Sequence, residues 1–296
     1  MDTKVSGTLI LGGGGFLGRY FAKVLGESSI IHTRVADLRH PNSVSFNLSS
    51  EQDLNQLFNE VDFSSVINCL GLASIEECEK NPELANWVNA EIPALVAKYS
   101  LNKGIDNLYI STDAVLSSRT GKKKENSSTF TGSIYSRTKL AGELETMANN
   151  PNSLIARVNF YGASPRNASL FEYFYNGIKA GRQTAGFENV FFTTMYAEDT
   201  AQACVRLIKK GSSGVFHVVG SERISKYEFG SLIAQQMSRK NLVLSKQADE
   251  KFLHLRSKDL ALDNEKMKAV LGDPPILTTG IQRAISENEK REENVC

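Results

Sequence analysis

Long apolar runs and an excess of charge of either sign are both absent from this 296-residue sequence. No stretch approaches the roughly 20 consecutive apolar residues that span a bilayer, so we expect no membrane segment. The 34 Lys and Arg residues nearly balance the 33 Asp and Glu residues, which leaves a net charge of +1. No global field therefore attracts nucleic acid or an anionic membrane surface, and we expect neither as a partner.

Cysteine and histidine are scarce and scattered. The sequence has four of each: Cys69, Cys78, Cys204 and Cys296, and His32, His40, His217 and His254. No Cys-x-x-Cys motif and no Cys–His spacing typical of metal ligands occurs, so we predict reduced thiols and no metal site. The N-terminus lacks a signal-peptide pattern, because its apolar segment runs directly into glycines. These features favour a cytoplasmic protein.

What the sequence does contain is the composition and periodicity of an α/β enzyme. Apolar residues make up 41% and charged residues 23%, as in ordinary globular proteins. Short apolar runs alternate with helix-like stretches, which is typical of a parallel sheet wrapped by helices. The predicted strands are residues 8–11, 30–34, 65–69, 108–111, 154–158 and 214–219. The predicted helices are residues 16–25, 51–60, 82–103, 135–148 and 226–237, the last with Ser225 as its N-cap.

This pattern predicts a Rossmann-type doubly wound parallel sheet in residues 1–160, followed by a smaller mixed α/β substrate domain in residues 161–296. The strand at residues 214–219 is a candidate to return to the first sheet. Residues 117–133, rich in Ser, Thr, Gly and Lys, are expected to form a solvated loop or a lid. The aromatic residues between 171 and 192 fit either a core or a surface that stacks on a nucleobase.

Four glycines end the first predicted strand and satisfy the pattern Gly-x-x-Gly-x-x-Gly at the junction with the first helix. Gly12 permits a tight turn, Gly15 allows the backbone to approach a pyrophosphate, and Gly18 allows close packing. The helix N-terminus that follows favours negative charge. A purely structural turn is the alternative, but the position within a βαβ unit favours a dinucleotide site.

The second predicted strand ends in Arg34. A carboxylate at this position would accept hydrogen bonds from the adenosine ribose of NAD, whereas a guanidinium matches a 2′-phosphate. We therefore predict NADPH as the cofactor. NADH is the alternative, because Asp37 lies close by and a short shift in register would exchange the two residues. Arg39 is a second, weaker candidate for the phosphate contact.

Tyr135 and Lys139 lie four residues apart on a predicted helix, after a strand that ends in Ser-Thr-Asp at residues 111–113. Residues at this spacing share a helix face, so the ammonium can stabilise a tyrosinate and lower a phenol pKa from about 10. Thr112 can hold a carbonyl oxygen while Tyr135 donates a proton to it. Each residue alone has an ordinary structural explanation, but together they predict carbonyl reduction.

In this combination the sequence resembles the extended short-chain dehydrogenases/reductases, and within them the dTDP-4-dehydrorhamnose reductase-like branch. The resemblance covers nearly the whole chain. Besides the motifs above, it rests on residues 47–49, 66–71, 76–89, 157–162, 215–220 and 262–266. It implies hydride transfer from a nicotinamide cofactor to the keto carbon of a nucleotide-activated 4-keto-6-deoxysugar.

The resemblance also implies roles for individual positions. Contacts to the pyrophosphate are implied for Gly15, Phe16 and Leu17, to the adenine for Asn47 and Leu48, and to the nicotinamide ribose for Gly71, Leu72 and Ala73. Tyr135 and Lys139 would serve both cofactor and catalysis. The substrate residues implied are Thr112, Asp113, Asn159 and Arg256, of which Arg256 would lie near the diphosphate.

Two departures from the family pattern bear on the substrate. Ala114 stands where dehydrorhamnose reductases show Tyr, and the residues after Arg157 differ from their Thr-Ser-Trp. A nucleotide-sugar reductase is therefore favoured over the rhamnose enzyme itself. A nucleotide-sugar epimerase or dehydratase with retained NAD is one alternative. A non-catalytic subunit like the regulatory subunit of methionine adenosyltransferase is another. The oligomeric state stays open, with a homodimer as one candidate.

Overall fold

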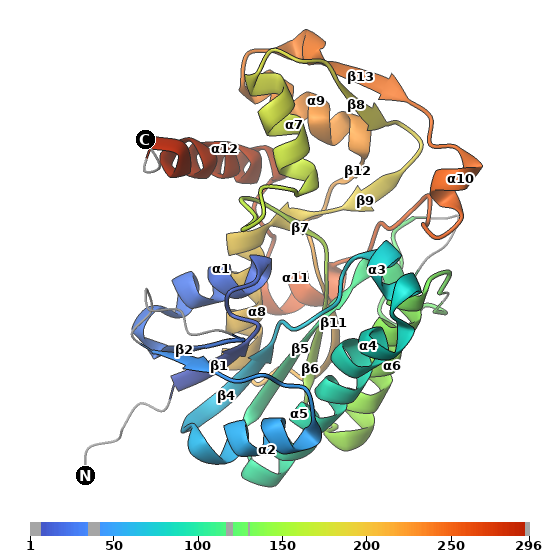
Figure 1. The fold of residues 1–296 in the computed structure, drawn as a ribbon. Helices are drawn as coiled ribbons and strands as arrows, with labels where there is room; N and C mark the ends of the chain where they lie inside the picture. The colour runs from blue at the N-terminus through green and yellow to red at the C-terminus, as the bar shows by residue number, and fades with distance from the viewer. Residues whose placement is uncertain (1–6, 35–41, 117–120, 130, 294–296) are drawn as a thin grey trace. The chain divides into compact units, whose positions relative to one another are not determined.

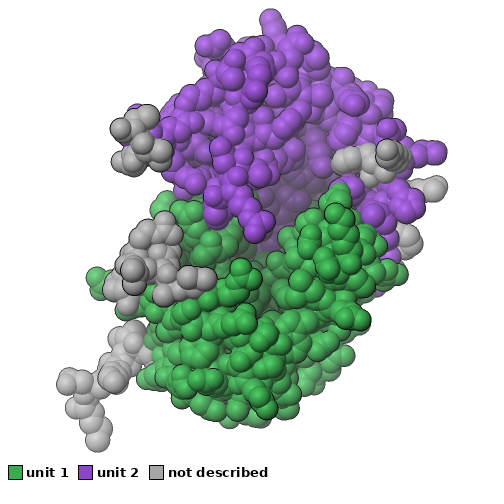
Figure 2. All heavy atoms as spheres, viewed as in Figure 1, with its two compact units in different colours: residues 1–115, 133–157, 201–216 green, residues 116–132, 158–200, 217–296 purple. Residues whose placement is uncertain are grey.

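A computed structural model describes residues 7–34, 42–116, 121–129 and 131–293 of the chain (Figure 1). The chain divides into two compact units (Figure 2). The first comprises residues 1–115, 133–157 and 201–216, and the second residues 116–132, 158–200 and 217–296. Among the described residues, no helix is both long and apolar enough to cross a membrane.

The first unit is built on a seven-stranded sheet in the order β11-β6-β5-β4-β1-β2-β3. The strands are β1 (Gly7–Leu11), β2 (Ser29–Thr33), β3 (Ser43–Ser45), β4 (Phe63–Asn68), β5 (Asp106–Thr112), β6 (Leu154–Val158) and β11 (Gly214–Val218). From β3 across to β5 every neighbouring pair is parallel. The predicted α/β fold with a Rossmann-type sheet is confirmed, and β11 lies beside β6 at the sheet edge.

Helices cover both faces of this sheet (Figure 1). They are α1 (Phe16–Leu25), α2 (Glu51–Glu60), α3 (Ile75–Lys80), α4 (Pro82–Asn86), α5 (Ile92–Lys103) and α6 (Ile134–Asn149), with short 3₁₀ turns at Gly26–Ser28 and Asp113–Val115. α1 packs on β1 and β2, whereas α5 packs on β4 and β5 beside α2 and α6. Serine capping boxes start α2 at Ser50 and α6 at Ser133, because each hydroxyl accepts an otherwise unpaired backbone N–H.

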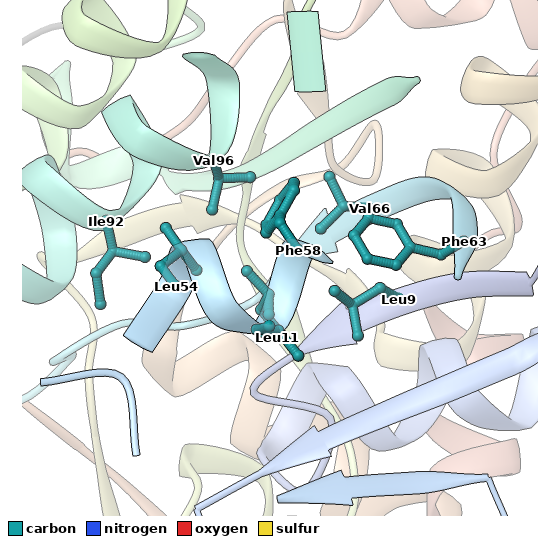
Figure 3. Close-up of a cluster of buried hydrophobic side chains, with 9 residues drawn as sticks. Leu9, Leu11, Leu54, Phe58, Phe63, Val66, Ile92 and Val96 are labelled. Atoms are coloured by element: carbon teal, nitrogen blue, oxygen red, sulfur yellow. The ribbon is translucent and has the colours of Figure 1, made fainter. Parts of the chain in front are cut away.

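A buried apolar cluster joins the sheet to α2 and α5 (Figure 3). Leu9 and Val66 project from neighbouring strands, and Phe58 from α2 stacks edge-on against Phe63 at 5.1 Å between ring centroids. The remaining members are Leu11, Leu54, Leu57, Ile92 and Val96. Each such side chain contributes about 1.5 to 3 kcal/mol on burial. This cluster fixes the strands whose carboxyl ends carry the predicted site.

The sequence pattern predicts one helix over residues 82–103, but the structure has two helices joined by a π turn at Trp87–Glu91. Pro93 has no backbone N–H and cannot donate to the carbonyl of Asn89, four residues earlier. The Ile92 N–H instead reaches Trp87 O, five residues back, and the Tyr109 hydroxyl donates to Asn89 O at 2.7 Å. Proline therefore explains the break, and a tyrosine from β5 satisfies the orphaned carbonyl.

The second unit combines short paired strands with helices. Its strands are β7 (Phe160–Tyr161), β8 (Thr184–Phe187), β9 (Phe191–Thr193), β10 (Met195–Tyr196), β12 (Arg223–Ser225) and β13 (Val243–Lys246). Its helices are α7 (Leu170–Lys179), α9 (Lys226–Gln236), α10 (Glu250–Leu253), α11 (Glu265–Leu271) and α12 (Leu277–Glu293), while α8 (Ala197–Lys209) and β11 contribute to both units. As predicted, Ser225 caps α9.

Two open questions from the sequence receive structural answers in this unit. The aromatic residues Phe171, Phe174, Tyr175 and Phe192 are buried, which supports the core interpretation for them, whereas Tyr173 is half exposed. Gly121, Lys122 and Lys124 are exposed, as expected for a solvated segment, but residues 121–125 are held in place by hydrogen bonds. Lys123 exchanges backbone hydrogen bonds with the 261–263 segment, and Glu125 Oε1 accepts from the His217 N–H at 3.1 Å. Residues 117–120 and 130 of the predicted loop lie outside the described residues.

Candidate active site

The glycine motif forms the turn between β1 and α1. Gly12 has a φ of 73°, which glycine adopts without strain, and the Gly15 N–H donates to Gly12 O at 2.9 Å. A Cβ on Gly18 would lie 2.4 Å from Gly12 O, so any side chain there would force the turn and helix apart. The turn therefore has the tight, close-packed geometry that its sequence predicts. The start of α1 follows this turn directly, and the backbone N–H groups of a helix N-terminus favour the binding of an anion.

His32 supports this turn from β2, although the sequence pattern predicts no role for it. Its Nδ1 accepts from the Gly12 N–H at 3.4 Å, its Nε2 donates to Phe46 O at 3.0 Å, and its own carbonyl accepts from the Gly13 N–H at 3.0 Å. Burial lowers the pKa of His32, so the imidazole is neutral and carries its proton on Nε2. The only sequence signal for His32 is that it is a polar residue within a predicted apolar strand.

Thr112 and Tyr135 meet at the carboxyl end of β5. The Thr112 hydroxyl donates to Asp113 Oδ1 at 3.0 Å and accepts from the Ala114 N–H at 3.2 Å. Burial raises the pKa of Tyr135 to about 12, against the opposing effect of a hydrogen bond with Thr112, and the nearby Asp113 carboxylate raises it further. Tyr135 is therefore a protonated phenol at neutral pH.

Lys139 lies one turn further along α6 and is only 4% exposed. Its Nζ donates to Ile110 O at 2.7 Å and lies 4.1 Å from the centroid of the Tyr109 ring. Burial lowers the pKa of Lys139 to about 7, although the Glu143 carboxylate opposes that change. The sequence pattern predicts that Lys139 lowers the pKa of Tyr135, but the structure does not support this. The Lys139 ammonium faces the β5 backbone, and burial has the largest effect on the Tyr135 pKa, which it raises.

A buried ion pair fixes the helix that carries both residues. Glu143, one turn beyond Lys139, accepts from Arg157 Nε at 2.9 Å and from Arg157 Nη2 at 2.7 Å, and it also accepts from the Ser111 hydroxyl. Arg157 comes from β6 and Ser111 from β5. The paired carboxylate therefore ties α6 to two strands at once, because a forked guanidinium fixes orientation as well as distance.

Asn89 connects the loop after β4 to α6. Its Oδ1 accepts from the Leu72 N–H at 2.9 Å, and its Nδ2 donates to Leu72 O at 3.1 Å and to Thr138 Oγ1 at 3.1 Å. Leu72 is one of three loop residues implied at the nicotinamide ribose, and its flanking residues Gly71 and Ala73 are exposed. The sequence pattern predicts no role for Asn89. The sequence signal that could have identified it is an amide residue four positions before a proline within a predicted helix.

The remaining predicted positions lie at two other places. Arg34, directly after β2, and Asn47, after β3, are exposed, while Leu48 is half buried. Asp37 and Arg39 lie outside the described residues. Asn159 and Arg256 belong to the second unit, where Asn159 O accepts from the Met195 N–H at 3.1 Å. Of the predicted catalytic and cofactor residues, the structure thus gathers the glycine turn, Gly71 to Ala73, Thr112, Tyr135 and Lys139 along the carboxyl ends of β1, β4 and β5.

This arrangement can bind a dinucleotide across the sheet edge and deliver a proton beside it. The carboxyl ends of parallel strands are where open α/β sheets bind ligands. A tight glycine turn fits a pyrophosphate, and a protonated tyrosine beside a threonine hydroxyl fits a carbonyl oxygen.

Comparison with known proteins identifies the family to which this chain is similar. The family model described as the RmlD substrate binding domain matches residues 6–289. The probable low-salt glycan biosynthesis reductase Agl14 of Haloferax volcanii is 31% identical over 185 residues, which cover 61% of this chain and 62% of that protein. The match therefore spans less than two thirds of that relative. Methionine adenosyltransferase 2 subunit beta of Mus musculus is 24% identical over 290 residues, which cover 94% of this chain and 86% of that protein.

A solved structure shows the same fold. The dTDP-4-dehydrorhamnose reductase of Bacillus anthracis, in complex with NADP, superposes with a TM-score of 0.82 at 22% identity, covering 95% of this chain and 99% of that one.

Proposed function

This chain belongs to the RmlD substrate binding domain family, the dTDP-4-dehydrorhamnose reductase-like branch of the extended short-chain dehydrogenases/reductases, and from that premise we propose that it reduces a nucleotide-activated 4-keto-6-deoxysugar. It is an NAD(P)-dependent oxidoreductase. The observation that carries the proposal is that Thr112 and Tyr135 meet at the carboxyl end of β5, with Lys139 one helix turn further on, in the same sheet whose β1 ends in the glycine turn. The fit of a dinucleotide is supported by the turn itself, where a Cβ on Gly15 would come within 3.0 Å of Gly12 O.

In the proposed reaction the bound dihydronicotinamide supplies a hydride to the keto carbon. Tyr135 donates its phenolic proton to the carbonyl oxygen, so the C=O group becomes CH–OH. The raised pKa of Tyr135 keeps that proton in place until negative charge develops on the oxygen. Thr112 orients the carbonyl, and Lys139 binds the hydroxyls of the nicotinamide ribose from the floor formed by Ile110 and Tyr109.

NADPH is the proposed form of the cofactor. The exposed Arg34 follows β2, at the position where a Rossmann sheet meets the adenosine ribose, and its guanidinium is suited to a 2′-phosphate. The proposed pyrophosphate contacts are those of Gly15, Phe16 and Leu17, and the proposed adenine contacts are those of Asn47 and Leu48. On the substrate side we assign Asp113, Asn159 and Arg256, with Arg256 at the diphosphate.

The direct test is consumption of NADPH with a panel of dTDP-, GDP-, CDP- and UDP-linked 4-keto-6-deoxysugars. We expect turnover with at least one of them, and turnover lower by at least about a hundredfold when Tyr135 is replaced by Phe. Stoichiometric NAD that stays bound through purification, with no net consumption of NADPH, would point instead to an epimerase or a dehydratase.

A regulatory subunit is the second candidate, because the methionine adenosyltransferase subunit aligns with 94% of this chain. The intact Thr112, Tyr135 and Lys139 favour the reductase. Recovery of a stoichiometric partner enzyme together with no oxidation of NADPH on any sugar of the panel would reverse this ranking.

A further inference from the structure

The π turn at Trp87–Glu91 is the one irregularity in the helices beside the proposed cofactor site, within the described part of the first unit. Pro93 makes it necessary, as described above, but does not explain which side chains it presents. Two of its five residues use side-chain N–H groups to bind loops that end different strands of the sheet. π turns within helices are frequent at functional sites.

Trp87 binds the loop on the adenosine side. Its Nε1 donates to Leu48 O at 2.9 Å, and its ring packs against the apolar cluster together with Leu48 and Leu70. Leu48 follows β3, which pairs with β2 at the edge of the sheet where the adenosine ribose binds in Rossmann folds. The indole therefore fixes the position of the Leu48 backbone, against which the adenine would pack.

Asn89 binds the loop on the reactive side. Its amide holds both backbone polar groups of Leu72, after β4, and also reaches Thr138 on α6. Thr138 Oγ1 in turn donates to the carbonyl oxygens of Ile134 and Tyr135, at 2.9 and 3.1 Å. Asn89 thus spans from the loop after β4 to the first turn of the helix that carries Tyr135.

The backbone of the same turn supports the floor under Lys139. Asn89 O accepts from the hydroxyl of Tyr109, whose ring lies 4.1 Å from the Lys139 ammonium. α6 passes closely over this point, since a Cβ on Gly142 would lie 2.1 Å from Asn89 O and 2.6 Å from the Tyr109 hydroxyl. The turn cannot shift without moving Tyr109, α6 or both.

We propose that this π turn is a positioning element that sets both ends of the dinucleotide site independently, through Trp87 at the adenosine end and Asn89 at the nicotinamide end. The proposal rests on the cofactor placement of the proposed function. Both are positioning residues, because each acts through the loop that it holds. If the turn only bent the helix, a substitution in it would weaken binding equally at both ends of the dinucleotide site.

The test separates the two ends with half-cofactors, adenosine 2′,5′-bisphosphate and nicotinamide mononucleotide, measured by calorimetry on the full-length protein. Trp87→Phe keeps the aromatic core and removes the hydrogen bond to Leu48. We expect it to weaken the adenosine fragment about three- to tenfold, the usual worth of a neutral hydrogen bond, and the nicotinamide fragment less than twofold. Tyr99→Phe is the matched control, because it removes an aromatic hydroxyl contact, 3.1 Å from Glu51, on the next helix.

The reciprocal variants act on the other end. Asn89→Asp removes both donated hydrogen bonds of the amide, and Thr138→Val removes only the link to α6 while keeping the shape of the side chain. We expect both to weaken the nicotinamide fragment, by about tenfold or more for Asn89→Asp, and to leave the adenosine fragment within twofold. Asn86→Ala is the control, since it removes an exposed contact to Glu91 at 2.7 Å in the preceding turn.

A spectroscopic signature accompanies the titrations. Trp87 is the single tryptophan of the sequence, so the emission of the wild-type protein reports on its contact with Leu48. We expect the adenosine fragment to change that emission and the nicotinamide fragment to leave it unchanged.

Crossed selectivity, with each variant weakening its own fragment, supports the proposal. Equal weakening of both fragments by Trp87→Phe and by Thr138→Val, or no effect of either variant, overturns it while leaving the cofactor site in place. If the wild-type protein binds neither fragment, the proposed cofactor site itself is wrong and the inference falls with it.

Discussion

The two ends of the proposed dinucleotide site are built differently. At the reactive end, Asn89, Thr112, Lys139 and Glu143 are buried and hydrogen-bonded to one another's elements. At the adenosine end, Arg34, Asn42 and Asn47 are exposed near the short strand β3. Buried polar groups are costly unless paired, so they hold one geometry, whereas exposed groups contribute affinity without fixing the fold. Substitutions at the reactive end should therefore change rate and stability, and those at the adenosine end only affinity.

Tyr135→Phe should produce the largest effect, because it removes the proton donor and keeps the ring. We expect turnover to fall by at least about a hundredfold, the lower range of general acid catalysis, with the NADPH dissociation constant changed only a few fold. Steady-state rates and a fluorescence titration measure both quantities. A variant that retains a tenth of wild-type turnover would exclude Tyr135 as the donor.

Arg157→Leu tests whether burial fixes the reactive end. The change leaves Glu143 buried without its guanidinium, so we expect the free energy of unfolding to fall by about 3 to 5 kcal/mol. Replacing Glu143 by Leu as well should recover most of that loss, because no unpaired charge remains. The control is Lys98→Met, which breaks a half-exposed pair with Glu51 and should cost no more than about 1 kcal/mol. Equal losses in the two single variants would refute the contrast.

Arg34→Ala should act on affinity alone. If the guanidinium binds the 2′-phosphate, NADPH binding weakens by about 1.5 to 3 kcal/mol, or roughly ten- to over a hundredfold, while NADH binding barely changes. Arg34→Asp should go further and favour NADH, because a carboxylate repels the phosphate and accepts from ribose hydroxyls. An unchanged preference in Arg34→Asp would remove the basis for NADPH. Thermal unfolding of both variants should match the wild type.

Lys139 predicts a pH-dependent effect on stability. Burial lowers its pKa to about 7 in the folded chain, whereas an unfolded lysine titrates near pH 10.4. Between these values the unfolded chain binds more protons, so this residue makes the folded state more stable as pH rises from about 7 to 10. The difference in unfolding free energy between wild type and Lys139→Met should grow over that window, with Lys98→Met as the control. A flat difference would mean that Lys139 titrates normally.

The same substitution tests the two roles assigned to Lys139. Lys139→Met should weaken cofactor binding and slow turnover together, because in the proposed function the ammonium holds the nicotinamide ribose and so also positions the nicotinamide for the reaction. If turnover falls and the NADPH dissociation constant stays unchanged, the ribose contact is wrong.

Local sequence signals predicted much of this fold. The helices at residues 16–25 and 51–60 begin and end where apolar periodicity places them, and the glycine turn follows from three glycines alone. Tyr135 and Lys139 could be found because their spacing lies within one helix. The break in the predicted helix 82–103 was missed because the apolar period continues through it, even though Pro93 marks the cause.

What the sequence did not predict depends on contacts between distant segments. Asn89 meets Leu72 seventeen positions earlier and Thr138 forty-nine positions later. His32 reaches the Gly12 N–H from the neighbouring strand, and the raised pKa of Tyr135 reflects burial created by the whole site. Most strands after residue 160 were also not predicted, because strands of two to four residues such as β9 are too short to show a period. The α7 helix is amphipathic, so its sequence does carry a helical signal, which the prediction did not use.

The most direct measurement of the central claim is the transfer of deuterium from C4-deuterated NADPH to a nucleotide-activated 4-keto-6-deoxysugar, read by mass spectrometry of the product. Because hydride transfer to the keto carbon is the proposed step, one deuterium per molecule of product is expected with wild-type protein, and at least about a hundredfold less labelled product in the same time with Tyr135→Phe. If NADPH labelled at either face of C4 yields only unlabelled sugar across the four nucleotide classes, the chain is not the reductase that we propose.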